Sequence, residues 1–141
     1  MKKIENSLIE AYENTNYHVF YDEEIIINIG KKNTDLNKLF KDKNLISASI
    51  ITAYNPFSDI MTDEQNISAQ LRLKKILEDS NSFYLNAIGK DPKNKWKGEA
   101  SFFIENISKE NAIKLGRKFN QNAIVWIDQN LIPELILCFI K

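Results

Sequence analysis

The chain has 141 residues, 43% of them apolar and 27% charged. This length suits one domain that buries a single hydrophobic core, and the composition excludes a disordered or fibrous protein. The 19 basic and 19 acidic side chains cancel, so no net charge draws the chain toward nucleic acid or an anionic membrane.

Hydrophobic periodicity predicts four helices and seven strands. Apolar residues three and four positions apart indicate helices, whereas aromatic and β-branched runs bounded by turn residues indicate strands. In chain order we expect a helix over 4–13, strands at 17–21 and 24–29, a helix capped by Asn33 or Thr34, a strand at 45–54, a helix from 63 to about 80, strands at 83–88 and 99–104, a helix after Ser108, and strands at 123–127 and 131–140.

Local signals mark an interior strand and two helix starts. The run 45–54 is apolar on both faces, which predicts a central strand, and Pro56 ends it. Thr62 and Gln65 fit a capping box, and Ser108 fits an N-cap. The helix after the capping box is expected to turn four apolar side chains toward the core: Ile67, Leu71, Ile76 and Leu77.

The order of these elements predicts an α+β domain. Neighbouring strand pairs with helices between them favour a mostly antiparallel or mixed sheet of five or more strands, with helices packed mainly on one face. The chain contains no repeat, linker or low-complexity segment. We therefore expect residues 1–141 to form a single domain.

The cysteine usage and the apolar runs indicate a cytoplasmic protein. A lone cysteine, Cys138, excludes an internal disulfide framework and suits a reducing compartment. Residues 1–6 are basic but lack the apolar stretch of a secretory signal. The longest apolar run, 131–140, is interrupted by Pro133 and Glu134 and is shorter than the ~20 residues of a membrane-spanning helix. We expect Cys138 to be a small buried side chain rather than a nucleophile.

Three stretches of the chain resemble a known family. They are Thr52-Ala53-Tyr54-Asn55-Pro56 followed by Asn66, then Trp96 with Glu99 and Ser101-Phe102, and last Phe119-Asn120-Gln121-Asn122-Ala123. In order and spacing they are similar to the small bacterial proteins known as domain of unknown function 3293, over residues 17–127. The resemblance implies a shared fold and singles out Glu99 and Ser101. It implies no activity, because the family has none assigned.

Six side chains stand at element ends or loop edges, where they could converge on a ligand-binding crevice: Asn55, Asn66, Trp96, Glu99, Ser101 and Gln121. Glu99 and Ser101 are two apart on a strand and therefore share a face. Gln121 begins the next strand, and a single intervening helix commonly returns the chain beside its origin. We expect Glu99, Ser101 and Gln121 in one concave region, with Asn55 at its rim and Trp96 folded over it.

Local alternatives stay open for these residues. Glu99 and Ser101 could simply form a solvated strand end. Asn55 could close an Asx turn with the backbone that follows it. Asn66 lies in the first turn of a helix, where free amides favour anions, but it could simply face water. Gln121 could bind loop backbone instead of a ligand.

The residue inventory argues against metal-dependent and nucleophilic catalysis. His18 is the only histidine, so a transition-metal site lacks ligands. The sequence contains no nucleophile elbow and no phosphate-binding glycine loop. Trp96 lies among four lysines between 90 and 97, which on a neutral chain favours a solvated loop over a nucleic-acid site. We expect no metal and no cofactor.

Three functions remain as hypotheses. The favoured one is a module that binds a small polar ligand or a peptide in the crevice. The second is a protein-interaction or regulatory subunit, with exposed aromatic anchors among Tyr17, Phe20, Tyr21, Phe57 and Trp96. The third is a small hydrolase that uses Glu99 as general acid–base, for which the sequence indicates no substrate.

Overall fold

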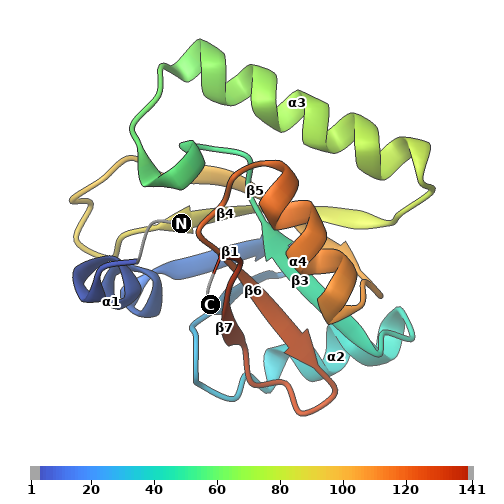
Figure 1. Ribbon diagram of the computed structural model, residues 1–141. Coiled ribbons are helices and arrows are strands. Elements are labelled where there is room, and N and C mark those ends of the chain that lie inside the picture. The colour runs from blue at the N-terminus through green and yellow to red at the C-terminus, as the bar shows by residue number, and fades with distance from the viewer. Residues whose placement is uncertain (1–3, 140–141) are drawn as a thin grey trace.

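The computed structural model describes residues 4–139 (Figure 1). Residues 1–3 of the N-terminal segment and residue 140 of the last predicted strand lie outside the described residues. The elements are α1 (Asn6–Asn14), β1 (Asn16–Phe20), β2 (Glu24–Ile27), α2 (Asp35–Asp42), β3 (Ser47–Ile51), the 3₁₀ turn η1 (Pro56–Ser58), α3 (Asp63–Asp79), β4 (Tyr84–Lys90), β5 (Glu99–Glu105), α4 (Lys109–Lys118), β6 (Ala123–Asp128) and β7 (Glu134–Leu137). Apart from η1, this is the predicted order of helices and strands.

The strands form one seven-stranded sheet in the order β2-β1-β4-β5-β3-β6-β7. Every neighbouring pair is antiparallel, so the predicted α+β class is confirmed. β3 is interior, between β5 and β6, and all five of its residues are buried. This agrees with its apolar pattern on both faces, although β5 holds the middle position of the sheet.

Helices cover both faces of the sheet. The two longest, α3 and α4, pack on one face around Ile51, Phe102 and Ile104. Leu36, Leu39 and Phe40 of α2 pack on the other face, against side chains that include Val19 and Phe103. The larger share of helical residues therefore lies on one face, as expected, and α2 fills part of the opposite one.

Helix starts follow the local signals in the sequence. The Thr62 side chain accepts a hydrogen bond from the Gln65 backbone N–H, and the Gln65 side chain accepts one from the Thr62 backbone, which completes the predicted capping box. The Ser108 hydroxyl likewise accepts from the Asn111 backbone N–H at the start of α4. Such caps satisfy amides that have no partner inside the helix.

The inward face of α3 differs from the prediction. Ile76 and Leu77 pack into the core, but Ile67 and Leu71 are 52% and 60% exposed. The face that meets the sheet instead carries Asn66, Ala69, Gln70, Leu73 and Leu77. Two of its polar side chains bind the backbone that follows β3, which a purely apolar stripe could not do.

α1 contributes no buried residue to the core, and its N-cap makes no side-chain hydrogen bond. It lies at one side of the sheet, apart from the other helices (Figure 1). No helix among residues 4–139 is long and apolar enough to cross a membrane.

Candidate functional site

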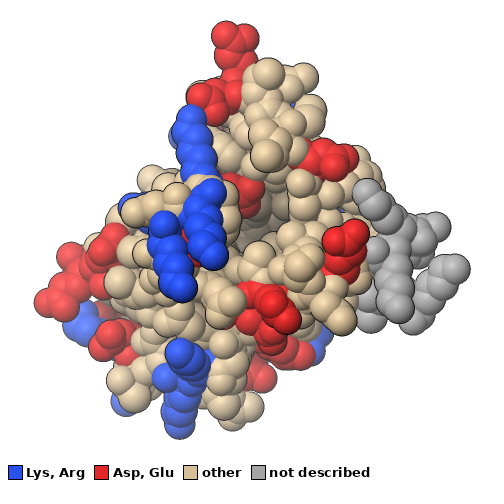
Figure 2. All heavy atoms as spheres, turned by 90° about the vertical axis from the view of Figure 1, so that its left-hand side faces the viewer, with Lys and Arg blue, Asp and Glu red and all other residues tan. Residues whose placement is uncertain are grey.

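A cavity of about 330 Å³ opens between α1, the segment after β3 and the loop between β4 and β5. Figure 2 shows this side of the molecule, hollowed near its centre, with basic side chains along one side of the hollow and acidic side chains on the other. The wall includes Leu8, Ala11, Tyr12, Thr15, Tyr17, Ile50, Thr52, Tyr54, Asn55, Ser58, Asp63, Asn66, Trp96, Lys97, Glu99, Ser101, Gln121 and Val125.

All six residues predicted for the crevice line this cavity: Asn55, Asn66, Trp96, Glu99, Ser101 and Gln121. They come from the segment after β3, from α3, from the β4–β5 loop, from β5 and from the turn before β6. The structure thus brings together segments that lie far apart in the sequence. Their role in binding stays a prediction.

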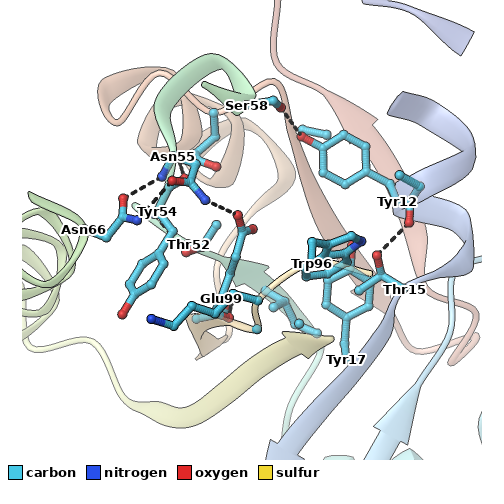
Figure 3. A pocket seen from close by; sticks show the side chains of 18 of the residues that line it. Tyr12, Thr15, Tyr17, Thr52, Tyr54, Asn55, Ser58, Asn66, Trp96 and Glu99 are labelled. Carbon is cyan, nitrogen blue, oxygen red and sulfur yellow. Dashed lines mark hydrogen bonds between the residues drawn. The ribbon is translucent and has the colours of Figure 1, made fainter. Parts of the chain in front are cut away.

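Glu99 is the acidic group inside the cavity. Its Oε2 accepts a 2.7 Å hydrogen bond from the Asn55 Nδ2 (Figure 3). Among the ion pairs of residues 4–139, none involves Glu99. Burial raises the pKa of the Glu99 carboxyl above its ordinary value, and the bond from Asn55, which favours the ionised form, opposes this by a smaller amount.

Asn66 holds Asn55 in place. Asn66 is buried, its Oδ1 accepts from the Asn55 backbone N–H at 2.9 Å, and its Nδ2 donates to the Asn55 Oδ1 at 3.0 Å. The Met61 backbone N–H donates to the same Asn55 Oδ1. Asn55 has a left-handed backbone with φ of 48°, as Asn tolerates. The Asn66 amide is therefore engaged by protein rather than by solvent.

Two buried glutamines hold the backbone ahead of Asn55. The Gln121 Nε2 donates to the Tyr54 carbonyl at 3.0 Å, so the predicted alternative of a bond to loop backbone is confirmed. On the other side, the Gln70 Oε1 accepts from the Ala53 backbone N–H at 2.9 Å. The sequence reasoning missed Gln70. Its position four residues after Asn66, on the same helix face, is the signal that could have identified it.

Glu99 and Ser101 share a face of β5, as strand alternation predicted. Ser101 is buried, and its hydroxyl donates to the Glu99 backbone carbonyl at 3.2 Å. On the next strand end, Thr52 donates to the Ala100 carbonyl at 2.6 Å and accepts from the Tyr54 N–H. These bonds fix the strand ends from which the cavity side chains project.

Aromatic side chains form the other side of the cavity. Figure 3 shows Tyr12, Tyr17 and Trp96 across from Glu99 and Asn55. Tyr17 was expected among the exposed anchors, but it is only 8% exposed, because its ring belongs to the buried core cluster. Burial, assisted by the nearby Glu99 carboxylate, raises the pKa of the Tyr12 and Tyr17 hydroxyls. Both therefore stay protonated near neutral pH.

One ion pair lies at the rim. The Lys97 Nζ contacts the Asp63 Oδ2 at 2.8 Å and connects the β4–β5 loop to the first turn of α3. Both side chains are exposed. The hydrogen bond to Asp63 raises the pKa of Lys97. The cation beside the cavity is thus already matched to an anion.

The remaining chemistry-bearing residues lie elsewhere. Cys138 is buried, as predicted, and burial raises the pKa of its thiol to about 11. His18 lies on β1, 3.3 Å from the Glu24 carboxylate. Within residues 4–139, no group of three or more His, Cys, Asp or Glu side chains could hold a metal ion.

A comparison with models of known protein families assigns the chain to a family. The model of the family Protein of unknown function (DUF3293) matches residues 51–124. The chain belongs to this family. The match includes all six predicted site residues, whereas Tyr12 and Tyr17 precede it. No curated protein matches the chain, and no solved structure does.

Proposed function

We propose that this DUF3293 protein binds a small ligand in the cavity beside α1. The observation that carries the proposal is the cavity itself, about 330 Å³, lined by aromatic side chains around a partly buried carboxylate. Small-ligand sites have this size, with mostly apolar walls and a few placed polar groups.

Preorganisation of the segment 53–61 supports the proposal. Asn55, Phe57 and Ser58 all have positive φ angles, and a phenylalanine adopts that conformation only against a steric cost. The Phe57 backbone N–H donates to the Asn120 carbonyl, which helps to hold the turn. Strained, over-determined backbone of this kind clusters at functional sites, where it aims a side chain. Here it aims the Asn55 amide at Glu99.

Ligand-detected NMR tests the proposal. A mixture of small amines, alcohols and acids is added to the protein, and saturation transfer identifies the compounds that bind. Ala11 lines the cavity from α1, so Ala11→Phe should fill the space and abolish binding. The control is Glu10→Phe, which places the same ring on the exposed side of that helix. Equal binding by both variants would contradict the proposal.

Hydrolysis at Glu99 is a second candidate. The observation in its favour is a carboxyl in a cleft whose pKa is raised by burial, a property that general acids share. Turnover of ester or glycoside substrates that disappears in Glu99→Gln would support it. Ligand binding without turnover would contradict hydrolysis and support the binding function only.

The interaction-subunit hypothesis has support outside the cavity. Ile67 and Leu71, neighbours on one face of α3, are 52% and 60% exposed and do not line the cavity. Large apolar side chains in water are typical of contact surfaces when they form one patch. Sedimentation of the wild-type protein and of Leu71→Ser tests this. If the surface mediates self-association, the sedimenting species should have a lower mass in the variant, and an equal mass would count against it.

A further inference from the structure

We propose that the ligand presents a primary ammonium group to the Glu99 carboxylate, with its apolar part enclosed by Trp96 and the cavity tyrosines. This inference rests on the ligand-binding function proposed above and names the chemical class of that ligand. Three features of the cavity carry it: the charges of its wall, the hydrogen bonds already made by Glu99, and its aromatic side.

The charged groups of the wall favour a cation. Of the Asp, Glu, Lys and Arg side chains that line the cavity, two are acidic, Asp63 and Glu99, and one is basic, Lys97. Lys97 and Asp63 neutralise each other at the rim. Glu99 is therefore left as the uncompensated charge, in a partly buried site where a missing counter-ion is costly. An anionic ligand would meet repulsion from Glu99, whereas a cationic one would supply the counter-ion.

The hydrogen bonds of Glu99 favour an ammonium over a guanidinium. Asn55 occupies Oε2, and no donor from residues 4–139 bonds to Oε1. A guanidinium binds best when both carboxylate oxygens accept its parallel N–H groups. An ammonium is a compact charge with three rotatable donors and needs only one such oxygen. Its other donors suit hydroxyl oxygens, and Tyr12 and Tyr17 line the same cavity.

The aromatic side of the cavity favours the same ligand class. Ring faces carry partial negative charge and attract a cation, an effect of about 0.5–2 kcal/mol that increases with desolvation. Tyr12, Tyr17, Tyr54 and Trp96 line the cavity. They also offer apolar surface to the body of an organic amine. A cavity of about 330 Å³ accommodates a small molecule rather than a long chain.

Three probes of similar size test the proposal: benzylammonium, benzyl alcohol and benzoate. Trp96 and Trp126 are the two tryptophans of the chain, so Trp126→Phe makes Trp96 the fluorescent reporter of the cavity. We expect benzylammonium to bind at least about tenfold more tightly than benzyl alcohol, and benzoate most weakly. Amide shift mapping on the wild-type protein gives the same comparison without the tryptophan substitution.

The matched variant is Glu99→Gln, which keeps an oxygen to accept from Asn55 but removes the charge. It should remove the preference for benzylammonium and leave the affinity for benzyl alcohol within about twofold. Equal affinities for the amine and the alcohol in the wild type would overturn the ammonium proposal while leaving cavity binding intact. A preference that survives Glu99→Gln would also overturn it. Failure of all three probes to bind would contradict the binding function itself.

The pH dependence gives a second readout. The other titratable groups that line the cavity are Tyr12, Tyr17, Tyr54, Asp63 and Lys97. Protonation of Glu99 removes the counter-charge, so benzylammonium affinity should fall as pH decreases through the raised pKa of Glu99. Benzyl alcohol should show no such fall. Amine affinity that is constant across this range would overturn the role of Glu99.

Discussion

α1 and α2 are helices of nine and eight residues with opposite relations to the core. α2 buries Leu36, Leu39 and Phe40, and the Asn33 side chain accepts from the backbone N–H groups of its first turn. α1 buries no residue and has no capping side chain. One helix therefore completes the core, whereas the other covers a cavity.

The side chains on the sheet face beneath these two helices also differ from one end of a strand to the other. Along β5, the inward positions run from Glu99 through Ser101 to Phe103, which is fully buried in the cluster that contains α2. Along β1 they run from Tyr17, on the cavity wall, to Val19. Toward α2 these positions are apolar and complete the core, whereas toward α1 they include the polar side chains of Glu99 and Ser101, which line the cavity. The contrast suggests four tests, ordered by expected effect.

The largest effect should come from shortening the same side chain in the two helices. Leu39→Ala in α2 should lower the free energy of unfolding by about 2–5 kcal/mol, because it leaves a void in a packed core. Leu8→Ala in α1 should lower it by less than about 1 kcal/mol, because Leu8 is only partly buried at the cavity wall and leaves no closed void. Urea denaturation measures both. Equal losses would show that α1 is part of the core.

The second largest effect on stability is expected at Gln121, which holds the backbone at the cavity. Gln121→Ala should cost about 1–3 kcal/mol of unfolding free energy, because the partly buried Tyr54 carbonyl loses its donor. Gln121→Glu is the matched variant, since it keeps the size but not the amide donor. A neutral effect of both substitutions, measured by denaturation, would show that Gln121 does not hold the turn.

The cavity residues also show how much of the site could be predicted from the sequence alone. The shared face of Glu99 and Ser101 follows from strand alternation, and the Thr62 cap follows from a local pattern. The inward orientation of the Asn66 and Gln70 side chains does not follow from the sequence. They bind backbone groups of the segment after β3, and no local pattern specifies the positive φ angles of that segment. Tyr12 was missed as a site residue because the position of α1 depends on tertiary packing.

A smaller effect on stability is expected at Glu99. The folded protein holds the Glu99 proton to a higher pH than the unfolded chain does, because its pKa is raised by burial. The wild type therefore loses stability as pH rises from the ordinary glutamate pKa through the raised value. Glu99→Gln should be the more stable protein at neutral pH, and the difference should vanish in acid. Thermal denaturation across pH measures this, and a destabilised variant at neutral pH would contradict it.

The smallest effect is expected at the rim. Lys97→Ala breaks an exposed ion pair and should change the unfolding free energy by at most about 1 kcal/mol. It also removes the basic side chain that lines the cavity, so benzylammonium should bind slightly more tightly, within about threefold. Lys95→Ala, in the same loop, is the control. Weaker amine binding in Lys97→Ala alone would mean that Lys97 contacts the ligand.

The most direct test of the account is a crystal structure of the protein with benzylammonium. We predict the amine in the cavity beneath α1, its nitrogen about 2.7–3.2 Å from the Glu99 Oε1 and its ring among Trp96 and the tyrosines. Glu99→Gln crystals grown in the same solution should lack it. An amine bound elsewhere, or a cavity closed by the side chains of α1, would contradict the account.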